Sequence, residues 1–407
     1  MNDHSGHVKN HRAGRVVLVT LGSVVSLLTL GLGVVVTVGG VFVPAAYLQP
    51  WSETYSQAFV DPRMKVVSQA VLAPSGHNMQ PWTIRLDQVD PKVLYLYADP
   101  TRLSPAVDPL ARQALVSQGA FLGYAQVAAE HLGYTASLEL FPGGTYDETG
   151  LEVSMSELPV AKITLSDRPS ASTDDYDSMF LSDTNRSPYT SAPLTDAQAT
   201  TLTDLADTSA LATLSVFSDT KNMTTLGDLA IEGTLIETEY LPATEESNAV
   251  FHSTEQSKNE ALSGFAVEGQ GTSGFMKYLL QGLITIVPSI NDDASAAANA
   301  IALTDAGVEN TAAYAMISTP GNTRVEQVEA GILYARLSLH ARTIGLVMQP
   351  LSQVLQEYPT MAAPYKAIHE QYAPDGATIQ MLVRVGTPTR EYPVTMRRDA
   401  NSLVDTP

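Results

Sequence analysis

Residues 73–82 read APSGHNMQPW. A helix is predicted just before them, because Asp61 and Pro62 suit the N-cap and the first turn of a helix. A β-hairpin is predicted just after them, over 82–86 and 93–98, where β-branched and aromatic residues alternate with others. The stretch is therefore expected to be an exposed loop on a rigid frame, stiffened at its ends by Pro74 and Pro81.

This loop carries an unusual density of hydrogen-bonding side chains. A hydroxyl, an imidazole and two amides come from Ser75, His77, Asn78 and Gln80. Such a set can bind the polar edge of a heteroaromatic ring, where donors and acceptors alternate. On composition alone, an ordinary Ser/Asn turn is the simpler interpretation.

Composition excludes several classes of function. The 407 residues are 44% hydrophobic, which is enough for a large core, and the net charge is −20. A strongly acidic chain is not expected to bind nucleic acid, which needs a basic surface. The absence of cysteine excludes disulfides, thiolate nucleophiles and cysteine-ligated metal sites. No metal site is predicted from any other motif.

The N-terminal region has the pattern of a membrane anchor. Residues 16–43 are almost all Val, Leu and Gly, and no charged residue occurs between Val16 and Glu53. A bilayer crossing needs about 20 apolar residues, so an uncleaved transmembrane signal anchor is predicted over 16–43. Because Lys9, Arg12 and Arg15 precede it, the tail 1–15 is expected in the cytoplasm and the following chain outside the cell membrane. The lipid bilayer is accordingly a predicted partner.

The remaining chain is predicted to be α+β, with helices on the faces of sheets. Two halves are expected, 61–166 and 184–400, joined by a Ser/Asp-rich linker over 167–183. Further strands are predicted at 135–141, 160–165, 212–217, 313–318 and 378–385, and long helices at 110–131 and 325–343. Residues 242–274 are predicted to be an irregular insertion in the second half.

Two motifs carry little weight. GQGTSG at 269–274 matches the dinucleotide-binding pattern, but no buried strand precedes it, so a flexible loop is the better interpretation. His369-Glu370 begins like a zinc-protease motif, but position 373 is Ala rather than His.

The loop motif, with Pro-Ser at 74–75, Asn78 and QPW at 80–82, resembles the flavin-contacting loop of the nitroreductase superfamily. The resemblance is greatest to its Acg-like branch of FMN-binding oxidoreductases. Other stretches agree in order: DP at 108–109, SQGA at 117–120, TNRSPY at 184–189, AG at 330–331, GL at 345–346, MLVRVG at 381–386 and RR at 397–398.

This resemblance implies a nitroreductase-like α/β sandwich in which two related halves form a pseudo-dimer within one, monomeric chain. It implies one FMN site, because the first half supplies the loop and the second supplies arginines, whose guanidinium groups suit phosphate. The cofactor-binding candidates are Pro74, Ser75, His77, Asn78, Gln80, Asn185, Arg186, Arg397 and Arg398. For each arginine singly, an ion pair with a nearby carboxylate is an equal alternative. The branch has a further arginine before TNR, where this chain has Ser182-Asp183, so one phosphate contact is missing.

The implied function is FMN-dependent electron transfer from a small-molecule donor to a nitroaromatic-like or quinone-like acceptor, in a ping-pong scheme. No catalytic side chain is predicted, because the flavin itself carries the chemistry. Two alternatives stay open: a flavin-storing protein without catalysis, and a degenerate scaffold that binds no flavin.

Overall fold

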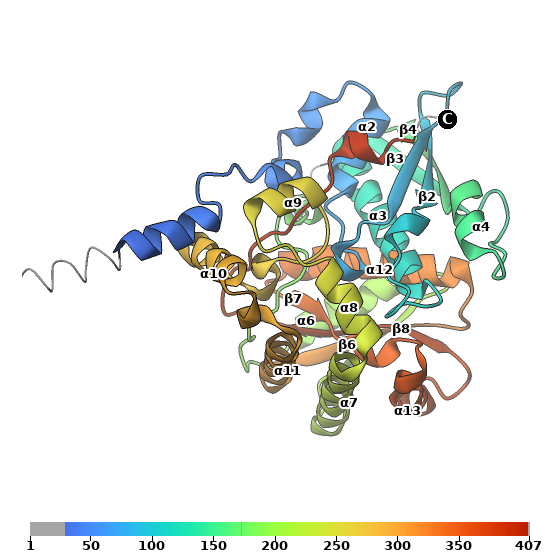
Figure 1. Ribbon diagram of the computed structural model, residues 1–407. Helices are drawn as coiled ribbons and strands as arrows, with labels where there is room; N and C mark the ends of the chain where they lie inside the picture. Colours follow the sequence, from blue (N-terminus) through green and yellow to red (C-terminus); the bar gives the residue numbers. More distant parts are fainter. Residues whose placement is uncertain (1–28, 172, 406–407) are drawn as a thin grey trace, which may run out of the picture.

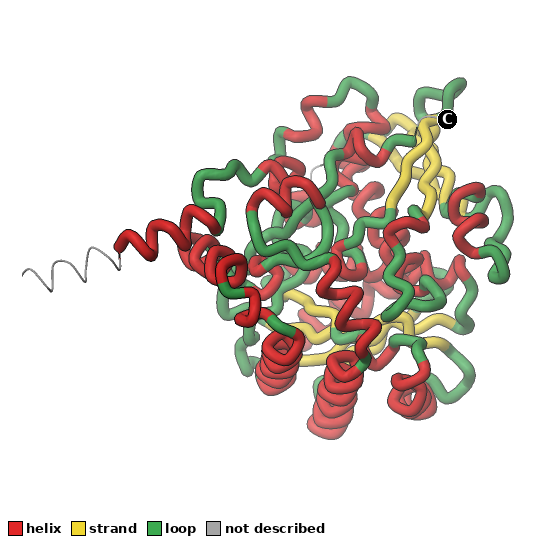
Figure 2. Tube along the Cα trace, in the orientation of Figure 1, coloured by secondary structure: helices red, strands yellow, loops and turns green. Residues whose placement is uncertain are grey.

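The computed structural model describes residues 29–171 and 173–405. Two antiparallel four-stranded sheets form the frame of the described chain, and helices pack between and around them (Figures 1 and 2). This arrangement agrees with the expected α+β class.

The first sheet has the strand order β1-β2-β4-β3. Its strands are β1 (Trp82–Leu86), β2 (Val93–Ala98), β3 (Tyr134–Leu140) and β4 (Ala161–Asp167). Helix α2 (Pro62–Ala70) precedes β1, α3 (Arg112–His131) joins β2 to β3, α4 (Leu151–Glu157) lies between β3 and β4, and α5 (Asp174–Ser178) follows. The Asp61 carboxylate caps α2 as predicted, by accepting a hydrogen bond from the Arg63 N–H at 2.9 Å.

The second sheet has the order β5-β6-β8-β7, which is the same connection pattern. Its strands are β5 (Thr213–Phe217), β6 (Ala313–Thr319), β7 (Val347–Pro350) and β8 (Thr378–Gly386). Helix α6 (Asp196–Asp204) precedes β5, α12 (Arg324–Thr343) joins β6 to β7, and α13 (Ala362–Tyr372) lies between β7 and β8. In each sheet, therefore, one long helix connects the second strand to the third.

The two long helices, α3 and α12, pack against each other at glycines. A Cβ atom on Gly119 would collide with the carbonyl oxygen of Val328, and one on Gly331 would collide with that of Val116. Side chains of α12, including Val328 and Ile332, belong to the same buried cluster as Trp82 and Phe121 of the first half. The small residues therefore let two backbones meet, and the two halves share one core.

The second half contains the larger connection. Between β5 and β6 the chain forms α7 (Thr220–Glu239), α8 (Leu241–Ala249), α9 (Glu255–Ala261), α10 (Gly274–Ile286) and α11 (Asp293–Glu309). The predicted irregular stretch 242–274 is thus largely helical. A capping box between Thr254 and Ser257 begins α9, and Pro242 lies in the first turn of α8. These are local signals that the polar composition of the stretch obscured.

The predicted transmembrane anchor is wrong. Residues 29–38 are helical, but the helix ends there and the chain turns at Gly39 and Gly40, which has φ +90°. Gly39 packs against the backbone at Tyr278, and Gly282 packs against Val35, so this helix lies along α10 (Figure 1). Within 29–171 and 173–405, no helix combines the length and the apolarity that crossing a bilayer requires.

The other membrane predictions depended on that helix and fall with it: a single-pass protein in the cell membrane, a cytoplasmic N-terminus, an outer flavin domain and a bilayer partner. The physical reason is that glycine-rich apolar sequence serves helix–helix contact as well as lipid contact. Residues 1–15 and 16–28 of the prediction lie outside the described residues.

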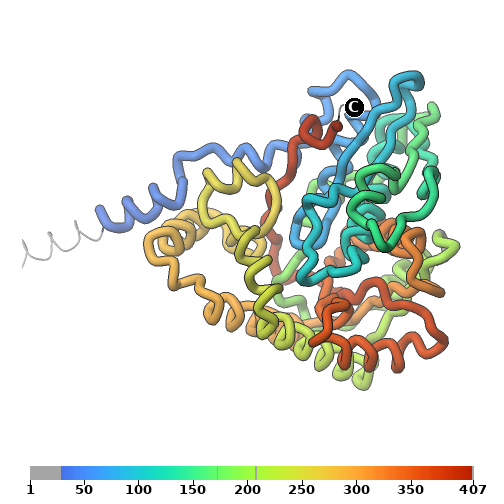
Figure 3. Tube along the Cα trace, turned by 45° about the vertical axis from the view of Figure 1, so that its right-hand side comes forward, coloured from blue at the N-terminus to red at the C-terminus, as the bar shows by residue number. Residues whose placement is uncertain are grey.

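The C-terminal segment returns to the first half. In Figure 3 it runs, in red, beside the blue N-terminal part. Ile84 forms a parallel bridge with Val404, and the Asp405 N–H donates to the Ile84 carbonyl oxygen at 2.9 Å. This crossing carries Arg397 and Arg398 from the second sheet to the loop before β1.

We expect Gly119→Ala to lower the free energy of unfolding by about 1–3 kcal/mol, because the added methyl group forces the two helix backbones apart. Denaturant unfolding of the variant and the parent measures this difference. Gly150→Ala is the control, since nothing lies within 4 Å of a Cβ atom at Gly150. Equal stability of the Gly119 variant and the parent would refute the role given to this contact.

Candidate functional site

The loop between α2 and β1 has an unfavourable backbone. Three residues other than glycine have positive φ: His77 at 49°, Asn78 at 53° and Gln80 at 51°. Left-handed conformations of this kind cost roughly 1–2 kcal/mol per residue, least for asparagine. Such strain persists only where the surroundings enforce it, and it concentrates at functional sites.

Hydrogen bonds from both halves hold this conformation. Within the loop, the Ser75 Oγ accepts from the Gln80 N–H at 2.9 Å, and the Gly76 N–H donates to the Ser117 Oγ of α3 at 3.1 Å. The Asn78 Nδ2 donates to the carbonyl oxygens of Gly264 at 3.2 Å and Met396 at 3.1 Å.

The second amide is equally occupied. The Gln80 Nε2 donates to the Leu262 carbonyl oxygen at 2.8 Å, and its Oε1 accepts from the Arg398 N–H at 2.8 Å. Gln80 is fully buried, as is Pro74. Both loop amides therefore fix the loop to the second half, and the described structure leaves neither free for a ligand.

The C-terminal arginine pair lies at the loop, as expected, but its donors point inward. Arg397 is fully buried; its Nη1 donates to Asn78 Oδ1 at 2.9 Å and its Nη2 to Asp183 Oδ2 at 3.0 Å. Arg398 donates from Nη1 to the carbonyl oxygens of Gln80 at 2.9 Å and Trp82 at 3.0 Å. Burial lowers the pKa of Arg398 to about 10, so it remains charged at neutral pH.

Arg186 lies in a different environment. It is only partly buried, and its Nη1 donates to the Gly269 carbonyl oxygen at 3.2 Å. The neighbouring Asn185 is a structural residue, since its Nδ2 donates to the Arg390 carbonyl oxygen and its Oδ1 accepts from the Ser187 N–H. Within the described residues, no carboxylate pairs with Arg186.

Two further arginines, which sequence reasoning missed, share this environment. Arg390 is exposed and lies against Gly271, with its guanidinium 5.8 Å from the centre of the Tyr392 ring. Arg384 is fully buried, and its donors reach only neutral acceptors, among them Gln349 Oε1 at 2.7 Å. The positive charges of Arg186, Arg384 and Arg390 each lower the pKa of the Tyr392 hydroxyl. Burial has the larger effect and raises this pKa, so the hydroxyl stays neutral.

This cluster is notable in a chain of net charge −20. In the described structure, Arg186, Arg384 and Arg390 form no ion pair, whereas Arg397 does. Uncompensated guanidinium groups near one another favour binding of an external anion. The turn at Gly269 and Gly271, which leads to the N-terminus of α10, borders the same place.

His77 connects the loop to this cluster. Its ring packs against Phe265 at 4.9 Å between centres, and its Nδ1 is buried without a hydrogen-bond partner in the described chain. Burial first, and then the positive charge of Arg186, lowers its pKa to about 4. The imidazole is therefore neutral at neutral pH, and its Nδ1 is buried without a hydrogen bond in the described chain.

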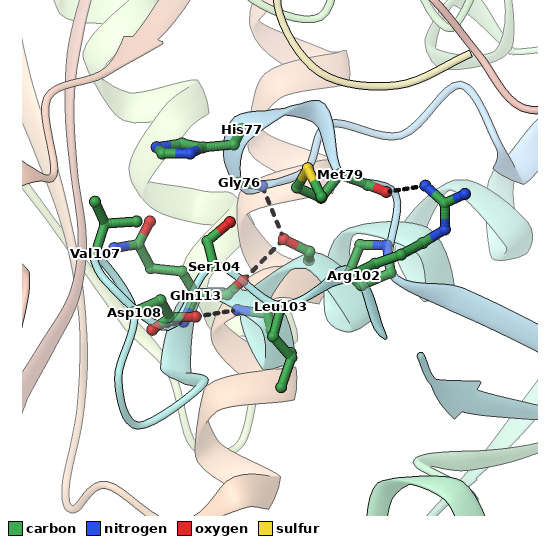
Figure 4. A pocket seen from close by; sticks show the side chains of 12 residues that line it. Gly76, His77, Met79, Arg102, Leu103, Ser104, Val107, Asp108 and Gln113 are labelled. Carbon is green, nitrogen blue, oxygen red and sulfur yellow. Dashed lines mark hydrogen bonds between the residues drawn. The ribbon is translucent and has the colours of Figure 1, made fainter. Parts of the chain in front are cut away.

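A cavity lies on the other side of the loop, between it and the start of α3 (Figure 4). Its volume is about 20 Å³, enough for one water molecule, whereas ligand pockets measure about 300–1,000 Å³. Its lining includes Gly76, His77, Arg102, Asp108, Gln113 and Ser117. This cavity cannot hold a flavin ring. In the described residues, no group of three His, Asp or Glu side chains could hold a metal ion.

Comparisons with known proteins give a limited result. No family model matches the chain. A stretch of 77 residues is 39% identical to two Mycobacterium tuberculosis proteins, from strains CDC 1551 and H37Rv, that are provisionally named NAD(P)H nitroreductases. The match covers 19% of this chain and 22% of each relative. The chain therefore aligns with only about a fifth of the length of these relatives.

Three solved structures align with low scores. They are nitroreductase A from Vibrio parahaemolyticus (12% identity, 58% of this chain and 77% of that chain, TM-score 0.34), an NADPH:FMN oxidoreductase from Vibrio harveyi complexed with NAD+ (11%, 57% and 77%, 0.33) and a protein from Anabaena variabilis that is provisionally named a nitroreductase (11%, 78% and 82%, 0.38). TM-scores in this range do not establish a shared fold.

We expect the stability of the protein to fall, relative to a His77→Asn variant, as the pH drops from about 6.5 to about 4. In this window the unfolded chain binds a proton at His77 that the folded chain excludes, so acid favours unfolding, by up to about 3 kcal/mol at the lower end. Asparagine tolerates positive φ and does not titrate.

Urea unfolding of both proteins at several pH values measures the effect. All other ionisable groups titrate in both proteins alike, so only the difference between the two curves reports on His77. Parallel curves from pH 7 to about 4 would show that His77 is not held neutral in the folded state.

Proposed function

We propose that this protein is a nitroreductase-type oxidoreductase that uses FMN. The observation that carries the proposal is that the APSGHNMQPW loop of the first half meets both arginine segments of the second. Asn78 bonds to Arg397 at 2.9 Å, Gln80 bonds to Arg398 at 2.8 Å, and His77 lies within the electrostatic reach of Arg186. The local identity to the two mycobacterial proteins supports the same class.

The chain fits the phosphate of FMN at one place and not at another. The Arg397 Nη1 and Nη2 are fully used by internal partners, and Arg398 donates three hydrogen bonds to backbone carbonyl oxygens. Arg186 and Arg390 have no carboxylate partner in the described chain and border the turn at Gly271. We therefore assign phosphate binding to Arg186 and Arg390, whose planar guanidinium groups can each donate two parallel hydrogen bonds.

The loop residues then have separate tasks. His77 lines the site with a neutral ring, and it does not act as an acid at neutral pH because its pKa is lowered to about 4. Asn78 and Gln80 orient the loop instead of contacting the ligand, since their polar atoms already bond to the second half. Ser75 retains its hydroxyl hydrogen for donation while its oxygen accepts from Gln80.

FMN, when bound, would supply two-electron chemistry, taking a hydride from a small-molecule donor and passing electrons to a nitroaromatic-like or quinone-like acceptor in two half-reactions. The chain's own contribution is binding and orientation. No acid–base side chain is assigned, in keeping with the expectation that none is needed.

One specific observation favours a second candidate, a scaffold that binds no flavin. The loop amides are fully used inside the protein, and the cavity beside them measures only about 20 Å³. Titration of the purified protein with FMN separates the two candidates. Saturable binding with bleaching of the flavin on addition of NAD(P)H without oxygen supports the enzyme, and absence of binding supports the scaffold.

We expect Arg186→Gln to weaken FMN binding by about 10- to 100-fold, the loss of a charge-assisted hydrogen bond worth roughly 1.5–3 kcal/mol. Riboflavin, which lacks the phosphate, should bind the variant and the parent equally. Fluorescence quenching of each flavin measures both affinities.

Arg168→Gln is the matched control, because Arg168 forms an exposed ion pair with Glu130 in the first half at 2.7 Å. An equal loss of FMN and riboflavin affinity in the Arg186 variant would show that this residue does not bind the phosphate. No loss of either would remove Arg186 from the site.

A further inference from the structure

Arg397 is a buried cation at the centre of the candidate site. It is fully buried, and its guanidinium lies 4.7 Å from the centre of the Trp51 ring. Four of its hydrogen bonds go to neutral acceptors, the Asn78 Oδ1, the Thr395 Oγ1 and two backbone carbonyl oxygens. Neutral acceptors satisfy the donors but do not compensate the charge.

The compensating charge comes from one residue, Asp183. Its Oδ2 lies 3.0 Å from the Arg397 Nη2, and its side chain is only 12% exposed. Asp183 is the last residue of the linker, directly before the segment that carries Arg186, whereas Leu72, which also accepts from Nη2, belongs to the first half. The Arg397 Nε remains buried without a partner in the described chain, so the guanidinium retains a donor for one more acceptor.

The same arginine holds the strained loop. Asn78, at φ 53°, is fixed through its Oδ1 by the Arg397 Nη1. The Asp183 carboxylate therefore contacts the Arg397 guanidinium, which in turn contacts the Asn78 amide. Through these two contacts the carboxylate stabilises the unfavourable backbone conformation of Asn78.

We propose that Asp183 is a built-in anion that occupies the position a ligand's phosphate would take at Arg397, and so holds the loop in shape without a ligand. Arg397 is then a positioning residue. The inference rests on the proposed function only where it concerns FMN. If Asp183 occupies the anion position at Arg397, the phosphate of FMN must bind elsewhere, and this agrees with its assignment to Arg186 and Arg390. The pairing itself is testable without any flavin.

The test is rescue by inorganic phosphate. Asp183→Ala removes the carboxylate and opens the space that it fills, so Arg397 loses its counter-ion and the variant should melt below the parent in chloride. At equal ionic strength, phosphate should raise the melting temperature of this variant by several degrees and leave that of the parent unchanged, because only the variant has an open anion position.

Asp61→Ser is the matched control. Asp61 pairs with the buried Arg63 at 2.7 Å, and serine preserves its role as a helix cap while removing the carboxylate. The Asp61 side chain is 30% exposed and the Arg63 Nη1 donates to three backbone carbonyl oxygens, so water can hydrate the arginine and phosphate should not stabilise this variant selectively. Equal rescue of both variants, or rescue of neither, overturns the inference.

If Asp183→Ala does not fold in either salt, Asp183→Ala combined with Arg397→Gln decides. Recovery of folding in the double variant shows that the unpaired guanidinium caused the failure and supports the inference. Failure of the double variant as well shows that Asp183 acts other than as a counter-ion. The FMN affinity of Arg186→Gln is measured separately, so the failure of one proposal is distinguishable from the failure of the other.

Discussion

The close contact of α3 with α12 is the constraint on which the rest of the structure depends. Gly119 and Gly331 bring two helix backbones together that side chains would otherwise separate. The two halves then share a buried cluster, and the C-terminal segment can cross to β1. Without this approach, the loop before β1 would have no carbonyl oxygens or arginines from the second half to hold it.

Charge and strain are balanced at the site in two different ways. At Arg397, a carboxylate of the same chain neutralises the cation and the loop is fixed. At Arg186, Arg384 and Arg390, the donors meet neutral acceptors or solvent, so positive charge accumulates in an acidic protein. The first arrangement suits support of a backbone and the second suits capture of an anion, and a single site contains both.

Sequence patterns predicted the frame well. The first two strands were predicted at 82–86 and 93–98, and they are found at Trp82–Leu86 and Val93–Ala98, because alternating β-branched and aromatic residues suit a half-buried sheet. The helix predicted over 325–343 begins at Arg324, after a capping box between Thr323 and Glu326. The membrane helix was predicted wrongly, because an apolar run rich in glycine has the same composition whether it faces lipid or another helix.

Residue types and local spacing identified a polar, proline-bounded loop, and the family resemblance pointed to the arginine segments. The loop was expected to be exposed, but in the structure only Gly76 of 73–82 is exposed, because the second half packs over it. Residue types and spacing could not reveal which atoms of these residues are free. Asn78, Gln80 and Arg397 have the chemistry of ligand-binding groups, yet the described structure directs them to internal partners. Arg390 became a candidate only through its position beside Gly271. The reason is physical: hydrogen-bonding capacity belongs to a residue type, whereas its use depends on what long-range folding brings within about 3 Å.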